Sequence, residues 1–193
     1  MKFVLATFNR DKARELEALL GLPGLEILSL SEFLGARPPE ETGASLEENA
    51  LLKAQAALRA TGLPAIADDT GLEVDALGGA PGVQAARFAG PDASYADNVR
   101  LLLERLSGVA GARRTARFRT VCVAVFPDGM QVVGEGMLEG RITESPRGDG
   151  GFGYDPVFEV DGRTLAERTP VEKNALSHRG RAARALASRL HER

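Results

Sequence analysis

Several short segments of this 193-residue chain concentrate side chains that bind anions or metal ions. The first of them contains Thr7, Phe8, Asn9, Arg10, Asp11 and Lys12, between an expected strand and an expected helix. A helix start presents backbone N–H groups and the positive end of the helix dipole, and both favour a phosphate. Asn9 could equally be an ordinary N-cap, and this segment alone does not decide between the two roles.

Two acidic clusters form the second candidate. Glu40 and Glu41 precede an expected helix, whereas Asp68 and Asp69 end a short apolar run at residues 64–67 that predicts a buried strand. Mg²⁺ is usually held by one or two carboxylates together with substrate phosphates, so clusters that converge in the fold could bind it. Solvated loop charges and a simple turn at Asp68 explain the same residues equally well.

A glycine-rich loop at residues 148–153 formally matches the dinucleotide-binding pattern G-x-G-x-x-G. That role requires a helix after the glycines, and here Tyr154, Asp155 and Pro156 follow instead, so we exclude it. The chain also has no G-x-x-x-x-G-K-[ST] phosphate loop. A flexible loop that carries Phe152 and Tyr154 is suited to closing over a flat ring.

The last candidate segment lies just before the C-terminal helix and contains Lys173, His178 and Arg179. Ser177 is a natural N-cap, which would place His178 and Arg179 in the first helical turn. A cation at that position opposes the helix dipole, and an anionic or carbonyl-rich ligand would reverse this cost. A solvated helix start remains the alternative.

The distribution of lysine points to the same segments. The chain has only four lysines, and every other cationic side chain is arginine. Three of the four are Lys12, Lys53 and Lys173, and Lys53 shares a helix face with Asn49. Lysine is a compact point charge that is often used to bind phosphate, so its retention at these positions suggests phosphate contacts.

The elements that must position these residues alternate between strand and helix near both ends of the chain. Strands are expected over residues 3–6, 26–30, 65–67, 115–126, 131–139 and 156–160. Helices are expected over residues 12–20, 45–60 and 94–106 and at the C-terminal end. Ser45 and Glu48 predict a capping box, Ser94 an N-cap, and Asp128-Gly129 and Asp161-Gly162 two hairpin turns.

This order of elements predicts an α/β fold with a mixed, elongated central sheet flanked by helices. We expect residues 1–193 to form a single domain with two lobes and a cleft between them. Hydrophobic residues make up 44 % of the chain, as in ordinary globular proteins, and the net charge of −3 argues against a nucleic-acid partner.

The lone Cys122 lies in an apolar run and predicts a buried strand residue. Only His178 and His191 are histidines, so no zinc cluster of Cys and His is expected. No signal peptide and no membrane-spanning run is found, so we expect no membrane association and a cytoplasmic location.

Together these segments resemble the inosine triphosphate pyrophosphatase family, also called the dITP/XTP pyrophosphatases. The resemblance rests on Thr7-Phe8-Asn9-Arg10-Asp11-Lys12; Glu40-Glu41-Thr42-Gly43 with Glu48-Asn49-Ala50 and Lys53; Ala67-Asp68-Asp69-Thr70-Gly71-Leu72; Leu77-Gly78-Gly79-Ala80-Pro81-Gly82; Gly151-Phe152-Gly153-Tyr154-Asp155-Pro156; and Glu172-Lys173-Asn174-Ala175-Leu176-Ser177-His178-Arg179. The motifs occur in the family's order along the whole chain. Phe8 is a departure, because many members have glycine there, and it bears on the backbone path beside the phosphates.

The resemblance implies a hydrolase that cleaves ITP, dITP and XTP to the monophosphate and pyrophosphate. It implies that Mg²⁺ is bound by Glu40, Asp69 and Asp68, with Asp69 also acting as the base that activates water. The phosphates and sugar would be bound by Thr7, Phe8, Asn9, Arg10, Asp11, Lys12, Lys53 and Lys173, reinforced by Thr70. The base would be framed by Phe152, Gly153, Tyr154, Asp155, His178 and Arg179. The family also implies a homodimer.

Base selectivity has a physical explanation under this reading. Inosine and xanthosine carry a carbonyl at C6, which a donor such as Arg179 or His178 can meet, whereas adenine carries an amino donor there. Two facing donors in a desolvated pocket would lower the rate by about 10²-fold or more. Two alternatives stay open: a nucleotide pyrophosphatase for a pyrimidine or a modified base, and a nucleotide-binding regulator without turnover.

Overall fold

The computed structural model describes residues 2–20, 26–33, 35, 37, 39 and 42–191, without the side chains at positions 10, 12–14 and 17. The chain divides into two compact units. Unit 1 consists of Met1–Asp69, Thr120–Gly136 and His178–Arg193, and unit 2 of Thr70–Arg119 and Met137–Ser177. Two compact units agree with the predicted two lobes, while the action of the whole chain as one domain stays a prediction.

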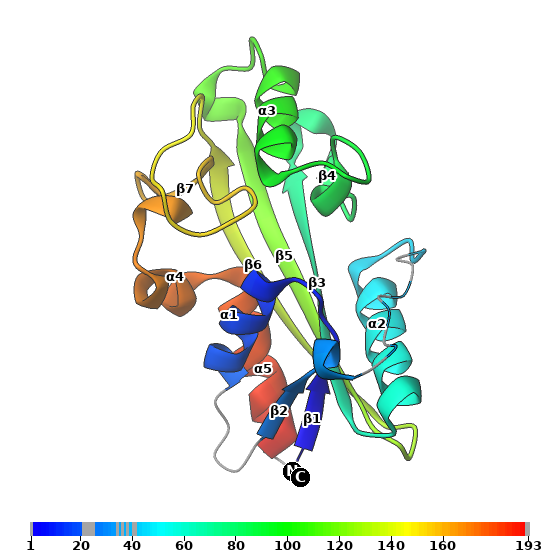
Figure 1. Ribbon diagram of the computed structural model, residues 1–193. Helices are drawn as coiled ribbons and strands as arrows, with labels where there is room; N and C mark the ends of the chain where they lie inside the picture. Colours follow the sequence, from blue (N-terminus) through cyan, green and yellow to red (C-terminus); the bar gives the residue numbers. More distant parts are fainter. Residues whose placement is uncertain are drawn as a thin grey trace. The chain divides into compact units, whose positions relative to one another are not determined.

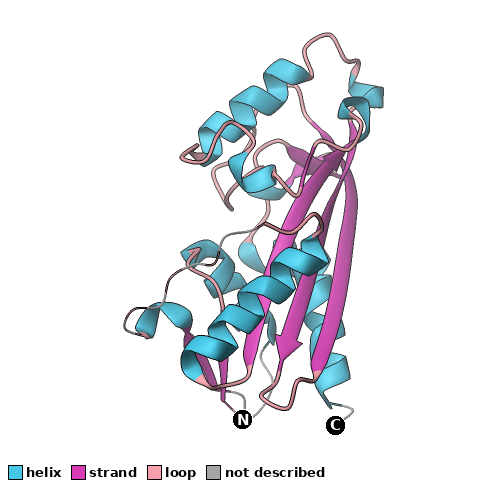
Figure 2. Ribbon diagram, turned by 90° about the vertical axis from the view of Figure 1, so that its right-hand side faces the viewer, coloured by secondary structure: helices cyan, strands magenta, loops and turns pink. Residues whose placement is uncertain are grey.

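Unit 1 alternates strands and helices. Its elements are β1 (Lys2–Leu5), α1 (Arg10–Leu20), β2 (Glu26–Ser29), α2 (Leu46–Thr61), the first half of β3 (Ala65–Val74) and α5 (His178–His191). Strand β1 pairs in parallel with β2 and with β3, as strand–helix–strand connections require. Within this unit α1 and α5 lie side by side on one face of the strands, and α2 covers the opposite face (Figures 1 and 2).

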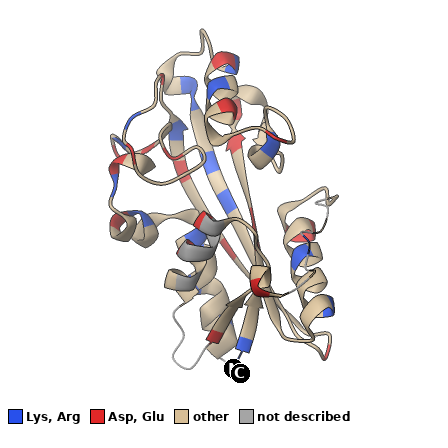
Figure 3. Ribbon diagram, in the orientation of Figure 1, with Lys and Arg blue, Asp and Glu red and all other residues tan. Residues whose placement is uncertain are grey.

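Unit 2 contains the hairpins and the shorter helices. Its elements are the second half of β3, β4 (Pro81–Gly82), α3 (Tyr95–Arg105), β7 (Phe158–Val160), β8 (Arg163–Thr164) and α4 (Pro170–Leu176). Strands β5 (Thr115–Val125) and β6 (Gln131–Ile142) each contribute residues to both units. Basic residues recur along β5 (Figure 3), where Arg117 contacts Glu73, Asp75 and Glu139 at 2.8–3.5 Å.

The strands confirm the predicted mixed sheet. In the described part of the chain, eight strands form one sheet in the order β2-β1-β3-β5-β6-β7-β8, with β4 paired to β3. The pairs β6–β7 and β7–β8 are antiparallel, in contrast to the parallel pairs of β1. None of the helices among the described residues has the length and apolar run that a bilayer crossing requires.

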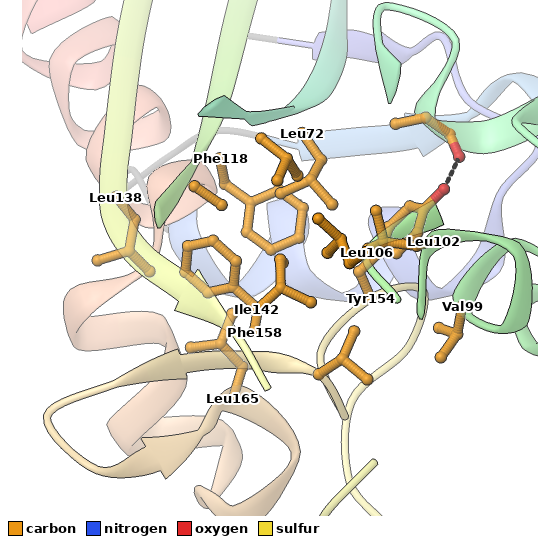
Figure 4. Close-up of a cluster of buried hydrophobic side chains, with 14 residues drawn as sticks. Leu72, Val99, Leu102, Leu106, Phe118, Leu138, Ile142, Tyr154, Phe158 and Leu165 are labelled. Atoms are coloured by element: carbon orange, nitrogen blue, oxygen red, sulfur yellow. Dashed lines mark hydrogen bonds between the residues drawn. The ribbon is translucent and has the colours of Figure 1, made fainter. Parts of the chain in front are cut away.

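The core of unit 2 gathers side chains from its strands and from α3. Phe118 and Phe158 lie at its centre with ring centroids 4.5 Å apart, and the same core contains Leu102 of α3 and Leu106, the C-cap of that helix (Figure 4). Tyr154 also lies in this core and donates its hydroxyl to the carbonyl of Ala85 at 2.8 Å. Burial raises the pKa of the Tyr154 hydroxyl well above its usual value.

The core of unit 1 depends on two glycines of β6 that let α5 approach the strand closely. A Cβ added to Gly136 would lie 2.1 Å from the carbonyl oxygen of His178 and 2.5 Å from the nitrogen of Ala182. One added to Gly134 would lie 2.4 Å from the nitrogen of Leu186. Only glycine therefore allows α5 to begin at this distance from the sheet. Cys122 is buried in the same core, as predicted.

Most predicted elements are confirmed, but three details were wrong. Strand β3 continues through Asp68 and Asp69 to Val74, where we expected it to end. The carboxylate of Glu48 accepts the N–H of Ala44 at 2.7 Å, one residue before the N-cap Ser45, in place of the second bond of the predicted capping box. Helix α4 was missed, although its start has clear sequence signals.

The start of α4 combines a capping box with proline at its first position. Thr169 accepts the N–H of Glu172, and the Glu172 carboxylate accepts the N–H of Thr169. That backbone hydrogen bond and one from Arg163 lower the pKa of the Glu172 carboxyl to about 2. The capping box and the proline are thus the sequence signals that predict this helix start.

Replacing Gly136 by alanine tests the close packing of α5. We expect Gly136→Ala to lower the free energy of unfolding by about 2 kcal/mol or more, because the added methyl meets backbone atoms that cannot rotate away. Gly111→Ala is the matched control, since its Cβ would meet nothing nearer than 4.0 Å, and it should change stability by less than about 0.5 kcal/mol. Urea denaturation measures both. Equal stability of the two variants would contradict the packing described here.

Candidate active site

The centre of the site in unit 1 is a pair of adjacent, buried carboxylates on β3. Asp68 is 2 % exposed and Asp69 is 5 % exposed. Successive side chains of a strand point to opposite faces of the sheet. Asp69 accordingly meets α2 and Asp68 meets α5, so the two carboxylates face different helices.

Asp69 forms an ion pair with Lys53. The Nζ of Lys53 lies 2.8 Å from Oδ1 of Asp69, and both side chains are about nine-tenths buried. This one contact joins a carboxylate that can bind a metal ion to a cation that can bind phosphate. The structure thus brings together Lys53 and Asp69, two residues that the sequence marked as separate candidates.

Asp68 is neutralised by Arg179, the second residue of α5. The Nε of Arg179 lies 3.3 Å from Oδ2 of Asp68, and its Nη1 lies 2.5 Å from Oε2 of Glu15 on α1. Burial alone lowers the pKa of Arg179, but the charges of Asp68 and Glu15 outweigh it and raise that pKa above its usual value. Arg179 therefore stays charged and ties α5 to α1 and β3.

The loop before α2 is attached to that helix by side-chain hydrogen bonds. Asn49 is fully buried, and its Oδ1 accepts the N–H of Gly43 at 2.8 Å. A Cβ on Gly43 would lie 2.7 Å from that oxygen, so the contact requires glycine. Ser45 accepts the N–H of Glu48 and caps α2, as predicted. Glu40 and Glu41 precede this anchored loop and lie outside the described residues.

The segment between β1 and α1 folds as a capped helix start. Oγ1 of Thr7 accepts the N–H of Asn9 at 3.1 Å, and Oδ1 of Asn9 accepts the N–H of Asp11 at 3.0 Å. The helix begins at Arg10, so Asn9 is its N-cap, and Lys12 falls in its first turn. Phe8 is 40 % exposed. The N-cap role and a phosphate-binding role are compatible, because the helix start still presents its dipole.

Unit 2 holds a second buried ion pair, next to the glycine-rich loop. The Nζ of Lys173 lies 2.7 Å from Oδ2 of Asp155, and each side chain is 5 % exposed. The same oxygen accepts the N–H of Phe152 at 2.8 Å. Lys173 also lies over the Phe152 ring, 4.6 Å from its centroid.

The predicted site residues thus form two groups. Unit 1 contains residues 7–12, Lys53, Asp68, Asp69, His178 and Arg179, whereas unit 2 contains Thr70, residues 152–155 and Lys173. His178 is the first residue of α5 and is buried. The Tyr154 ring, which we expected beside the base, packs into the core of unit 2 and stabilises the loop from that side.

Three contributors to the site were not assigned a role from the sequence. Glu15 contacts Arg179 across 164 residues of chain, which leaves no local signal. Gly136 sets the position of His178, and nothing in its surroundings distinguishes it from other strand glycines. Asn49 was noted for sharing a helix face with Lys53, and that spacing is the signal that could have predicted its role.

The donors present fit a metal ion that arrives with phosphate ligands. Among the described residues, no three or more His, Cys, Asp or Glu side chains group as a metal cage. Mg²⁺ needs only one or two carboxylates when phosphates supply other ligands, and Asp69 provides a rigid carboxylate on a buried strand. Because Asp69 is paired with Lys53, a metal ion at the carboxylate and a phosphate at the lysine would lie next to each other.

This geometry defines an α/β protein with paired carboxylates and cations suited to an anionic ligand. Comparisons with known proteins agree: residues 3–189 match the sequence pattern of the Ham1 family. The dITP/XTP pyrophosphatase of Methylococcus capsulatus is 57 % identical over 195 residues, covering 98 % of this chain and 96 % of the relative. That of Thermus thermophilus is 53 % identical, covering 96 % and 90 %.

Solved structures give the same result. A HAM1 protein from Coxiella burnetii is 41 % identical with a TM-score of 0.90 and covers 100 % of both chains. The nucleoside-triphosphatase (dITP/XTP pyrophosphatase) from Mycobacterium abscessus is 47 % identical with a TM-score of 0.77, covering 96 % of this chain and 98 % of that one. The chain therefore belongs to the Ham1 family, which confirms the resemblance drawn from the six motifs.

Removing Lys53 tests the buried ion pair. We expect Lys53→Met to lower the free energy of unfolding by about 3 kcal/mol, because the Asp69 carboxylate stays buried after its cation is lost. Lys2→Met is the matched control: the Lys2–Glu26 pair has a similar distance of 3.0 Å but side chains that are 58 % and 54 % exposed. It should cost about 0.5 kcal/mol or less. Urea denaturation of both variants gives the comparison, and similar losses would contradict the account.

Proposed function

We propose that this protein hydrolyses the purine nucleoside triphosphates dITP, XTP and ITP to the monophosphate and pyrophosphate. The observation that carries the proposal is the Lys53–Asp69 contact at 2.8 Å, which places a phosphate-binding cation beside a metal-binding carboxylate. The relatives named dITP/XTP pyrophosphatase support the choice of substrate. We therefore propose a nucleotide as the partner that the site binds. We also propose that the protein forms the homodimer which the family resemblance implies.

The proposed cofactor is Mg²⁺, held by Asp69 and by Glu40 together with the substrate phosphates. When bound, Mg²⁺ neutralises charge on the phosphates and on the departing pyrophosphate. Asp68 was expected to help hold the ion. Its contact with Arg179 on the other face of β3 favours an indirect role instead, in which it fixes the strand that carries Asp69.

Binding of the triphosphate requires Lys53 and Asp69 to exchange partners. Lys53 passes from the carboxylate to a phosphate oxygen, and the freed carboxylate of Asp69 would hold the metal ion and accept the proton of the attacking water. Because both groups are already buried and oriented, little rearrangement is needed when the substrate arrives. Thr7, Asn9 and the start of α1, with Lys12, bind the remaining phosphates, as the helix dipole favours.

The chemical step is the attack of water on the α-phosphorus. Asp69 accepts the proton of the attacking water, the new bond forms between water oxygen and α-phosphorus, and the bond to the bridging oxygen breaks. Pyrophosphate leaves with its negative charge stabilised by Lys53 and Lys12. A positioned general base of this kind contributes about 10²- to 10⁴-fold to the rate.

The residues proposed for the base come from both groups. Phe152 provides a flat apolar surface for the purine ring, and Asp155 holds the backbone beneath it through the N–H of Phe152. His178 and Arg179 provide donors for the C6 carbonyl of hypoxanthine or xanthine. An adenine amino group would face those donors and leave them unpaired, which rejects ATP.

The test is pyrophosphate release from dITP, XTP, ITP, ATP and GTP, with Mg²⁺ and with EDTA. We expect rapid release from the first three with Mg²⁺, little from ATP and GTP, and none in EDTA. Asp69→Asn should lower kcat by about 10²- to 10⁴-fold. Asp128→Asn, in an exposed hairpin turn, is the matched control and should retain full activity.

Three outcomes would contradict the proposal. Release of orthophosphate in place of pyrophosphate would show that water does not attack the α-phosphorus. Equal rates on all five nucleotides would show that the enzyme does not discriminate between the bases. Binding without any turnover would identify a nucleotide-binding regulator.

A further inference from the structure

Tyr95 is a large aromatic side chain that the fold leaves 42 % exposed at the start of α3. The backbone beneath it is firmly held. Ser94 and Asp97 form a capping box, and the buried Asn98 forms hydrogen bonds with backbone groups of the preceding segment. An exposed ring on such a well-fixed helix start keeps a defined position, which suits a role in recognition.

The ring of Tyr95 contacts the ring of Phe152. Their centroids are 5.9 Å apart and their planes are inclined by 36°. Both rings line a cavity of about 600 Å³ in unit 2, together with Val99, Leu103 and Pro146. The aromatic and apolar part of its lining matches the chemistry of a flat ring system, and Arg100, Glu104 and Asp149 line it as well.

The ring of Phe152 gains little support from its two chain neighbours. It lies between Gly151 and Gly153, whose φ angles are +70° and +63°, so neither neighbour has a side chain to support the ring. Asp155 fixes the backbone of Phe152 through its N–H. Two other elements contact the ring, through Tyr95 of α3 and Lys173 of α4.

We propose that Tyr95 is a positioning residue for base recognition: it supports the Phe152 ring in the orientation that stacks on the purine. This inference rests on the proposed function, since it assigns the base of the same substrate to the Phe152 loop. The proposed role belongs to the ring of Tyr95, because the contact with Phe152 is between the two rings. Loss of the ring should weaken binding of the base and leave the chemistry at the phosphates unchanged.

The experiment compares Tyr95→Ala and Tyr95→Phe with the wild type on dITP. We expect Tyr95→Ala to raise KM by about 3- to 10-fold with kcat unchanged within about twofold, as the loss of an aromatic pair predicts. Tyr95→Phe should restore the wild-type KM. Val171→Ala, which changes another exposed apolar side chain, is the control and should change neither parameter.

Inhibition by inorganic triphosphate separates base recognition from general damage. This probe has no base, so its inhibition constant should be the same for the wild type and for Tyr95→Ala. An unchanged KM in Tyr95→Ala, or an equal loss of dITP and triphosphate binding, would overturn the inference.

The dissociation constant of dITP in EDTA is measured alongside. A wild type without turnover would refute the proposed function, while the effect of Tyr95→Ala on this constant would still decide the role of Tyr95.

Discussion

Burial of two adjacent carboxylates on β3 is the constraint from which the arrangement of unit 1 follows. A buried charge without a partner costs several kcal/mol, so Asp68 and Asp69 each need a cation within contact distance. Lys53 of α2 provides one on the first face of the strand, and Arg179 of α5 provides the other on the opposite face. Glu15 of α1 completes the second pair. Three helices are thus fixed to one strand by charge. The close approach at Gly136 allows one of them, α5, to reach the strand.

The same pattern recurs in unit 2, where Lys173 and Asp155 form a buried pair beside Phe152. In each unit a buried lysine suited to an anionic ligand, Lys53 or Lys173, already contacts a carboxylate of the protein. The charges are thereby neutralised within the fold, which stabilises the site before any ligand is bound. Under the proposed function, an anionic ligand exchanges with Asp69 at Lys53, and a metal ion that arrives with the ligand would compensate the displaced carboxylate. This coupling gives a physical reason for a nucleotide and a metal to bind together.

Local signals in the sequence predicted much of this structure. The Asp128-Gly129 turn, the Ser94 and Ser45 caps and the alternation of strands and helices act over a few residues and were confirmed. Asp68 and Asp69 were placed at a strand end because the apolar run stops before them, yet β3 continues because cations 16 and 111 residues away neutralise them. The six motifs identified the family and its candidate residues, whereas the tasks of Glu15, Gly136 and Tyr95 depend on long-range contacts that no local pattern encodes.

The most direct test of the exchange at Asp69 is the dissociation constant of XTP in EDTA, measured by calorimetry for the wild type and Asp69→Asn. Without a metal ion, the Asp69 carboxylate competes with the phosphates for Lys53 and repels them. Its neutralisation should therefore tighten binding by about tenfold, although the same substitution removes the proposed catalytic base. Added Mg²⁺ should strengthen binding to the wild type far more than to the variant. Equal or weaker binding by a folded Asp69→Asn variant in EDTA would contradict the account.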